Sequence, residues 1–279
     1  MEAVDSNRQA VQIDEACLHQ GTQQSPCSAV FYAHNLHALW AALNIEGRSE
    51  EAIAIARRLA AMTPSEAARQ APSVEPWITL PLCTLVRFGK WTEILQEPQP
   101  LPDLQYVTAL WHYARGLALS ATGRLDEAER ERVSLETIAA AIPPEQIAIE
   151  RNTAANLLRI ASLVVAGELA AKREHTDEAV KSLQKAVHLQ DQLLYTEPPS
   201  WYYPVRHSLG AVLLAANRPA EAEAVYREDL RRNPENGWSL YGLTQSLRTQ
   251  NKDEEATVTE QRFHTAWVRA DVTLSGSRF

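Results

Sequence analysis

Apolar residues recur along this chain at intervals of three and four positions, and each such stretch is followed by a short turn and a second similar stretch. Leu36, Leu39 and Leu43 have this spacing, which places them on one face of a helix. Beyond the turn at Gly47, small apolar residues follow at Ala52 and Ala56. The pattern predicts pairs of amphipathic helices, each pair joined by a tight turn.

A Glu-Ala dipeptide marks the second helix of five of these pairs. The last two marker alanines, Ala222 and Ala256, are 34 residues apart, and the earlier gaps are longer. A 34-residue period is typical of tetratricopeptide repeats, in which each repeat is a helical hairpin. We therefore expect an all-α protein, a right-handed α-solenoid of about six TPR-like hairpins. The dipeptides are Glu51-Ala52, Glu127-Ala128, Glu178-Ala179, Glu221-Ala222 and Glu255-Ala256.

The repeat pattern predicts one superhelical domain over residues 26–279, after an irregular or partly helical N-terminal lead-in at residues 1–25. Turn signals such as Gly123-Arg124-Leu125-Asp126 separate the two helices of a unit. Scarce glycine, 10 in 279 residues, also favours helices over strands. The six predicted units cover residues of about 33–66, 75–98, 104–140, 145–194, 201–234 and 236–270.

Two gaps exceed the period. The gap from Ala128 to Ala179 has its surplus near Pro143-Pro144, after which residues 145–172 contain no proline. This stretch predicts one long helix that carries Glu150 and Glu168. The second excess is the segment 195–204, which is rich in proline and aromatic residues.

Composition narrows the classes of partner and location. A net charge of −8 argues against binding to duplex nucleic acid. The sequence contains no run of 18 uninterrupted apolar residues, so it predicts no membrane span. The first residues lack a secretory pattern, which favours a cytoplasmic location. Three cysteines without a CxxC spacing indicate neither a disulfide framework nor a thiolate zinc site. Phosphate-loop, GxSxG and HExxH motifs are absent.

The first helix of each repeat should line the concave face of such a solenoid, and its inward positions are unusually polar and aromatic. These features favour recognition of a peptide or protein segment. The inward residues in this alignment are His34, His37, Tyr113, Glu150, Glu168, His207, Trp238, Tyr241 and Arg248.

A metal site is an alternative use of the same face. His34 and His37 are three residues apart and could ligate one metal from a single helix face, with further ligands from Glu150, Glu168, His112 or His207. Groove-lining or structural histidines are the alternative interpretation.

The aromatic loop, which we define as residues 195–204, is a second candidate binding feature. Trp201 and Tyr202, with Arg206 and His207 just beyond the loop, would suit an extended peptide or a carboxylate. The alternative is that these aromatic rings fill the enlarged gap between units four and five.

Five stretches of the sequence are similar to a known family: YAHNLHALWAALNIEGR, LVRFGKWTEIL, HYARGLALSATGR, EPPSWYYPVRHSLGAVLLAANRPAEAEAVYREDLRRNPENGWSLYGL and AWVRADVTLSGSRF. They resemble bacterial tetratricopeptide-repeat proteins of poorly defined function, from about residue 28 onward. Members look longer at the N-terminus, so the resemblance implies that this chain corresponds to their C-terminal half. It implies a helical solenoid, and it carries no catalytic residues that could be transferred to this chain.

These observations predict a non-catalytic scaffold that holds a protein or peptide on its concave face and needs no cofactor. The ligand-binding candidates are His34, His37, Tyr113, Glu168, Trp201, Tyr202, Arg206, His207, Trp238 and Tyr241. A metal-binding protein or metal-dependent enzyme that uses His34, His37, Glu150 and Glu168 is the alternative. Self-association through an exposed apolar end of the array is a third possibility.

Overall fold

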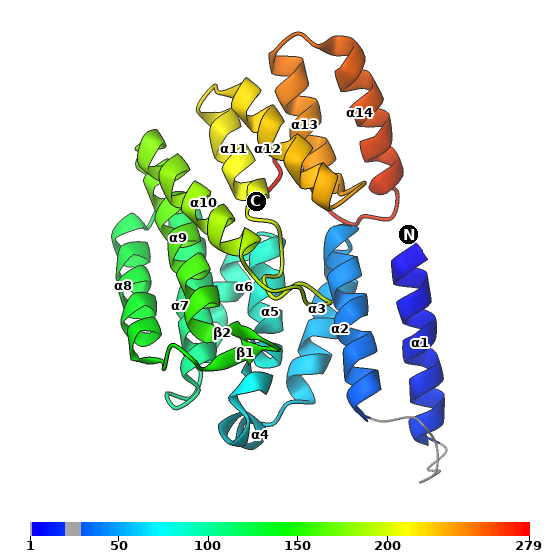
Figure 1. Ribbon diagram of the computed structural model, residues 1–279, viewed down its shortest axis with the longest axis vertical. Helices are drawn as coiled ribbons and strands as arrows, with labels where there is room; N and C mark the ends of the chain where they lie inside the picture. The colour runs from blue at the N-terminus through cyan, green and yellow to red at the C-terminus, as the bar shows by residue number, and fades with distance from the viewer. Residues whose placement is uncertain (1, 20–28) are drawn as a thin grey trace.

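The computed structural model describes residues 2–19 and 29–279, and this part of the chain is 73% helical with 14 α-helices (Figure 1). The predicted all-α class is confirmed. Helix α1 (Glu2–His19) lies in the predicted lead-in and packs against α2. A short helix, α4 (Ser65–Gln70), and a 3₁₀ turn at Pro72–Val74 follow the first hairpin.

Twelve of the helices form six antiparallel hairpins, and each hairpin packs on the next in chain order. The hairpins are α2 (Ala29–Ile45) with α3 (Ser49–Ala61), α5 (Glu75–Arg87) with α6 (Trp91–Gln96), α7 (Gln105–Ala121) with α8 (Leu125–Ala141), α9 (Ala154–Lys172) with α10 (Thr176–Asp191), α11 (Arg206–Ala215) with α12 (Pro219–Arg232), and α13 (Gly237–Thr249) with α14 (Asp253–Ala266).

All six hairpins turn in the same way. One residue in each turn has a positive φ, and the next N–H donates to a carbonyl five residues earlier, as Arg124 does to Leu119 at 2.8 Å. This bond satisfies a carbonyl that the end of a helix would otherwise leave unpaired. The positive-φ residues are Gly47, Gly89, Gly123, Glu174, Asn217 and Asn251.

The predicted long helix over residues 145–172 is wrong in its first third. Strands β1 (Ile147–Ile149) and β2 (Asn152–Thr153) form a small antiparallel pair, and α9 begins only at Ala154. Glu150 lies in the turn between the strands with φ of 51°. It therefore does not share a helix with Glu168, which lies inside α9.

The last hairpin lies beside the first one (Figure 1). The Trp238 indole N–H of α13 donates to the carbonyl of Asn44 in α2 at 3.1 Å. The Trp267 ring, at the end of α14, covers Gly47 so closely that a Cβ at that glycine would overlap it. The row of hairpins thus closes on itself, and its inner faces enclose a shared interior.

Aromatic and aliphatic side chains fill this interior and join all six hairpins into one core. Helix α9 is long and apolar enough to cross a membrane by length and composition alone, but 67% of its apolar window is buried in the protein. Its apolar character is explained by this packing. Cys83 is a buried free thiol, whereas Cys17 is disulfide-bonded, which the cysteine spacing did not indicate.

Candidate functional site

Of the nine residues predicted to line the concave face, four are buried, two are half-buried (His37 and Tyr241) and three are exposed (His34, Glu150 and Arg248). Tyr113 is 1% exposed, and His207 and Trp238 are 0% exposed. Glu168 is buried as well. In this conformation these side chains are therefore contacted by other parts of the same chain.

The aromatic loop supplies part of that cover. Trp201 is 2% exposed and packs edge-on against Tyr113, with ring centroids 5.6 Å apart. The Tyr202 and Tyr113 hydroxyl groups lie 2.8 Å apart and share a hydrogen bond. The buried Asn152 side chain of β2 bonds to Ser200 of the loop and to the backbone of Leu194, just before it. The loop thus packs into the interior against α7, which belongs to the third predicted unit, and not only between units four and five as the alternative interpretation had it.

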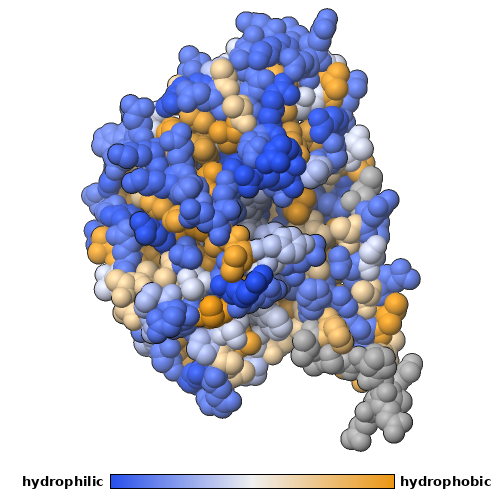
Figure 2. Space-filling view, in the orientation of Figure 1, coloured by the Kyte–Doolittle hydropathy of each residue, from blue (hydrophilic) through white to orange (hydrophobic). Residues whose placement is uncertain are grey.

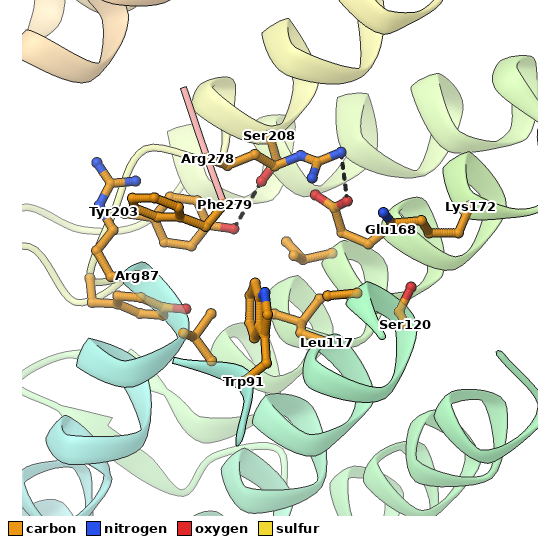
Figure 3. A pocket seen from close by; sticks show the side chains of 14 residues that line it. Arg87, Trp91, Leu117, Ser120, Glu168, Lys172, Tyr203, Ser208, Arg278 and Phe279 are labelled. Atoms are coloured by element: carbon orange, nitrogen blue, oxygen red, sulfur yellow. Dashed lines mark hydrogen bonds and ion pairs between the residues drawn. The ribbon is translucent and has the colours of Figure 1, made fainter. Parts of the chain in front are cut away.

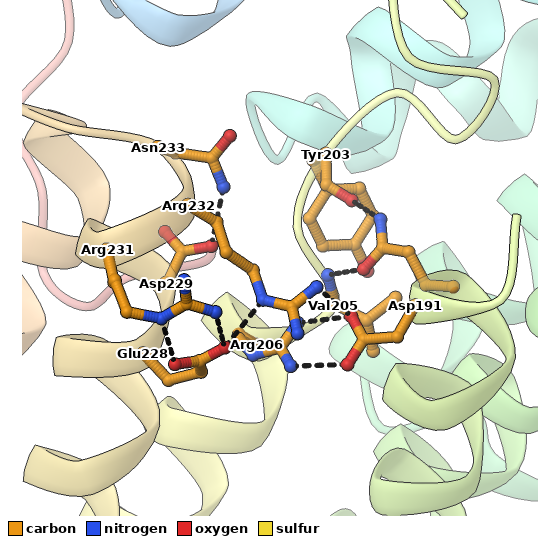
Figure 4. A network of polar contacts seen from close by, with 10 residues as sticks. Asp191, Tyr203, Val205, Arg206, Glu228, Asp229, Arg231, Arg232 and Asn233 are labelled. Atoms are coloured by element: carbon orange, nitrogen blue, oxygen red, sulfur yellow. Dashed lines mark hydrogen bonds and ion pairs between the residues drawn. The ribbon is translucent and has the colours of Figure 1, made fainter. Parts of the chain in front are cut away.

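Arg206, a predicted ligand-binding residue, is engaged in a polar network at the outer edge of the interior (Figure 4). Its guanidinium donates to both carboxylate oxygens of Asp191, at 2.7 and 2.6 Å. Arg232 donates to the same carboxylate at 2.9 Å. Asp191 therefore ties the ends of α10, α11 and α12 together, and Arg206 has little capacity left for a ligand.

His207 belongs to a second buried network. Its Nε2 lies 3.1 Å from the Asp229 carboxylate, which also accepts from the Ser239 hydroxyl at 2.6 Å. Burial lowers the pKa of His207, so the ring is neutral at pH 7 and donates through Nε2. These are residue types of a catalytic triad, but the serine bonds the carboxylate and not the imidazole. The network links α11, α12 and α13 within the core.

The C-terminal segment, which we define as residues 271–279, runs along this inner face. The Ser277 hydroxyl donates to the carbonyl of His207 at 2.7 Å, and the Arg278 guanidinium pairs with Glu168 at 2.9 Å. The Phe279 ring lies edge-on to Trp238, with centroids 5.7 Å apart. Three consecutive residues of the segment thus contact three predicted concave-face residues.

A cavity of about 160 Å³ lies beside the C-terminal segment (Figure 3). Its polar wall contains Glu168, which burial gives a raised pKa despite the nearby Arg278 and Lys172. Its apolar wall includes Trp91 and Leu117. Figure 3 shows the Arg278 and Lys172 side chains converging on the Glu168 carboxylate. The cavity is therefore a small amphipathic space next to the bound segment.

Arg87 is a buried residue of this region that the sequence pattern did not single out. Its guanidinium carbon lies 3.5 Å from the centroid of the Trp238 ring and 5.4 Å from that of Tyr203. Burial lowers its pKa to about 9, which leaves it charged at pH 7. The aromatic faces stabilise this buried cation. Its position inside the apolar helix α5 gave no sequence signal for this role.

A second and larger cavity, of about 420 Å³, opens between α2, α5, α7, the turn of the β-hairpin and the aromatic loop. It gathers five of the predicted site residues, of which Trp201 and Tyr202 come from the loop. His34, His37 and Glu150 are the other three. The histidine cluster and the aromatic loop, which were separate predictions, therefore share one site.

The proposed metal ligands are divided between the two cavities. His34, His37 and Glu150 line the larger cavity, and Glu168 lines the smaller one. Among the described residues, no group of three or more histidine, cysteine, aspartate or glutamate side chains is placed to hold a metal ion. As these four residues lie, they do not form one site.

Tyr241 lies away from both cavities. Its ring packs edge-on against Phe263, at 5.4 Å between centroids, and joins α13 to α14. On the face seen in Figure 2, hydrophilic residues dominate the outer surface, and hydrophobic ones appear in the hollows between them.

No known family model matches the chain, and no curated protein is similar to it at a significant level.

Proposed function

We propose that the protein is a non-catalytic scaffold of the tetratricopeptide type, a right-handed α-solenoid of six hairpins whose inner groove recognises an extended peptide. We also propose that the protein is bacterial and cytoplasmic and that its partner is a protein or a peptide. One observation carries it: the chain's own C-terminal segment lies in the groove and contacts Glu168, His207 and Trp238. These are residues whose type and position predicted peptide contacts.

The chemistry of these contacts defines a preferred peptide. Glu168 supplies a buried carboxylate for an arginine, and the backbone carbonyl of His207 accepts from a hydroxyl. Trp238 offers an aromatic face to a following aromatic ring. A Ser-Arg-aromatic sequence therefore fits, with the arginine as the charged anchor. The C-terminal segment acts as an internal ligand that a partner must displace.

Competition by the tethered segment makes the proposal testable. A tethered ligand acts at an effective concentration of about millimolar, so a free peptide competes poorly with it. In a variant with Arg278→Ala and Phe279→Ala, a fluorescein-labelled peptide of residues 271–279 should bind at least tenfold more tightly than to the natural chain. Fluorescence anisotropy measures this, and circular dichroism shows whether the variant is folded.

Glu168→Gln in the same background should weaken peptide binding about tenfold, because it removes the charge that pairs with arginine. Glu254→Gln, on the exposed face of α14, is the matched control and should change nothing. The proposal would be wrong if the double variant, its Glu168→Gln derivative and its Glu254→Gln derivative bound the peptide equally, or if none of these variants bound it while folded. Self-association stays a prediction, which light scattering tests.

A further inference from the structure

The larger cavity has aromatic walls, and we call it the aromatic cavity. Its rings come from three different helices and the aromatic loop, so the fold and not one local motif assembles it. A volume of about 420 Å³ falls in the range of small-molecule sites. The rings that line it belong to Trp40, Trp77, Tyr106, Trp201 and Tyr202.

The charged groups of the aromatic cavity are all acidic. Glu150 enters from the turn of the β-hairpin and Glu197 from the aromatic loop, and both are exposed. No lysine or arginine is among the described residues that line it. Burial, with a smaller contribution from His34, lowers the pKa of His37 to about 4, so that ring is neutral at pH 7. Carboxylates at the rim and neutral rings inside favour a cation over an anion.

We propose that the aromatic cavity binds a small organic ammonium ion. The aromatic faces stabilise the cation, as they do in known ammonium sites. Glu150 and Glu197 neutralise its charge at the rim. The ligand is small enough to enter while the C-terminal segment stays in place, so this site works independently of the peptide groove.

Choline is a suitable probe because its neutral isostere, 3,3-dimethylbutan-1-ol, has the same shape without the charge. Calorimetric titration of the full chain at low salt should show choline binding at least tenfold more tightly than the alcohol. Equal affinities would show an apolar pocket without cation preference and would overturn the proposal, as would the absence of choline binding.

Substitutions then locate the site. Trp77→Ala should weaken choline binding at least tenfold, because Trp77 is a half-buried wall of the cavity. Trp91→Ala is the matched control, since Trp91 lines the smaller cavity. Glu150→Gln combined with Glu197→Gln should weaken binding about tenfold, and these exposed residues can be changed without loss of the fold. Unchanged affinity in this double variant would contradict the assigned site.

The peptide assay separates the two proposals. In the Arg278→Ala and Phe279→Ala background, Glu150→Gln combined with Glu197→Gln should leave binding of the peptide of residues 271–279 unchanged, because Glu150 and Glu197 line the other cavity. Loss of choline binding with retained peptide binding is the expected pattern.

Discussion

The carboxylate of Asp271 accepts hydrogen bonds from the backbone N–H groups of Ser49, at 2.7 Å, and of Glu50, at 3.0 Å. The first N–H groups of a helix have no partner within it, and no nearby side chain caps α3. A residue from the far end of the chain thus provides the cap. It joins the start of the C-terminal segment to the first hairpin and helps to close the row of hairpins.

Replacing Asp271 by alanine should lower the free energy of unfolding by about 1–2 kcal/mol, as the loss of a helix cap does elsewhere. Asp271→Asn should cost less, because its amide oxygen keeps one acceptor. Urea denaturation measures both. If neither substitution changes the unfolding midpoint, the cap does not contribute to stability.

The same cap has a defined pH dependence. Although burial acts to raise it, the N–H groups of Glu50 and Ser49 hold the pKa of Asp271 below its usual value. A carboxyl with a depressed pKa stabilises the fold above its unfolded pKa, of about 4, and loses that contribution as the pH falls.

Hairpin turns offer a test of backbone strain without packing effects. A Cβ at Gly123, where φ is 80°, would meet no atom within 4 Å. Gly123→Ala should nevertheless destabilise the protein by about 1 kcal/mol, because the left-handed conformation is strained for alanine. At the same turn position Glu174 has φ of 63°, so Glu174→Gly should raise stability by up to about 1 kcal/mol. Thermal melts that shift in the same direction for both variants would contradict this explanation.

The hairpins could be predicted because their signals are local. Leucines at helical spacing and glycines at turns such as Gly47 and Gly123 mark the ends of helices within a few residues. Glu174 occupies an equivalent turn without glycine, and there the adjoining His175-Thr176-Asp177 supplied the signal. Local propensity and the final structure agree at these places.

The β-hairpin could not be predicted from such local signals. Residues 145–153 contain no glycine, and their apolar residues fit a helix as well as a strand. Pairing between Ile147 and Thr153, together with the bonds from Asn152 to the aromatic loop, decides the conformation. Those bonds join residues more than 40 positions apart, and a periodicity analysis does not detect them.

The burial of the candidate site could not be predicted from the sequence pattern. His207 and Trp238 were predicted as ligand-binding residues, yet the C-terminal segment and the aromatic loop cover them. Closure of the last hairpin onto the first depends on contacts such as Trp238 with Asn44, across 194 positions. No repeat alignment contains that information.

Tyr226 is clamped between two helices at points where only glycine fits. A Cβ at Gly210 of α11 or at Gly242 of α13 would overlap its ring. Gly242→Ala should therefore destabilise the protein by about 2–3 kcal/mol, as overpacking does in other cores. Gly116→Ala, where the nearest atom is a Val165 methyl at 3.2 Å, is a milder control and should cost less than about 1 kcal/mol.

A double-mutant cycle checks the source of that cost. When Tyr226 is replaced by leucine, Gly242→Ala should cost much less than in the natural chain, because the methyl group gains space. If the losses of unfolding free energy from the two substitutions are additive, the cost of Gly242→Ala does not come from overlap with the Tyr226 ring. Tyr226→Phe should cost about 1 kcal/mol, because it removes only the hydrogen bond to Ser277, at 2.6 Å.

His37 should make the protein sensitive to mild acid. Its ring stacks on Trp40 with centroids 5.4 Å apart, and burial lowers its pKa from 6.5 to about 4. Because the unfolded chain then binds the proton more readily than the folded one, stability falls as the pH drops from 6.5 towards 4. The loss should reach about 2 kcal/mol at pH 5. His37→Gln should remove that part of the pH dependence in urea denaturation at pH 7, 6 and 5, while the contribution of His207 remains. Parallel curves for the two proteins would show that His37 does not titrate as its burial requires.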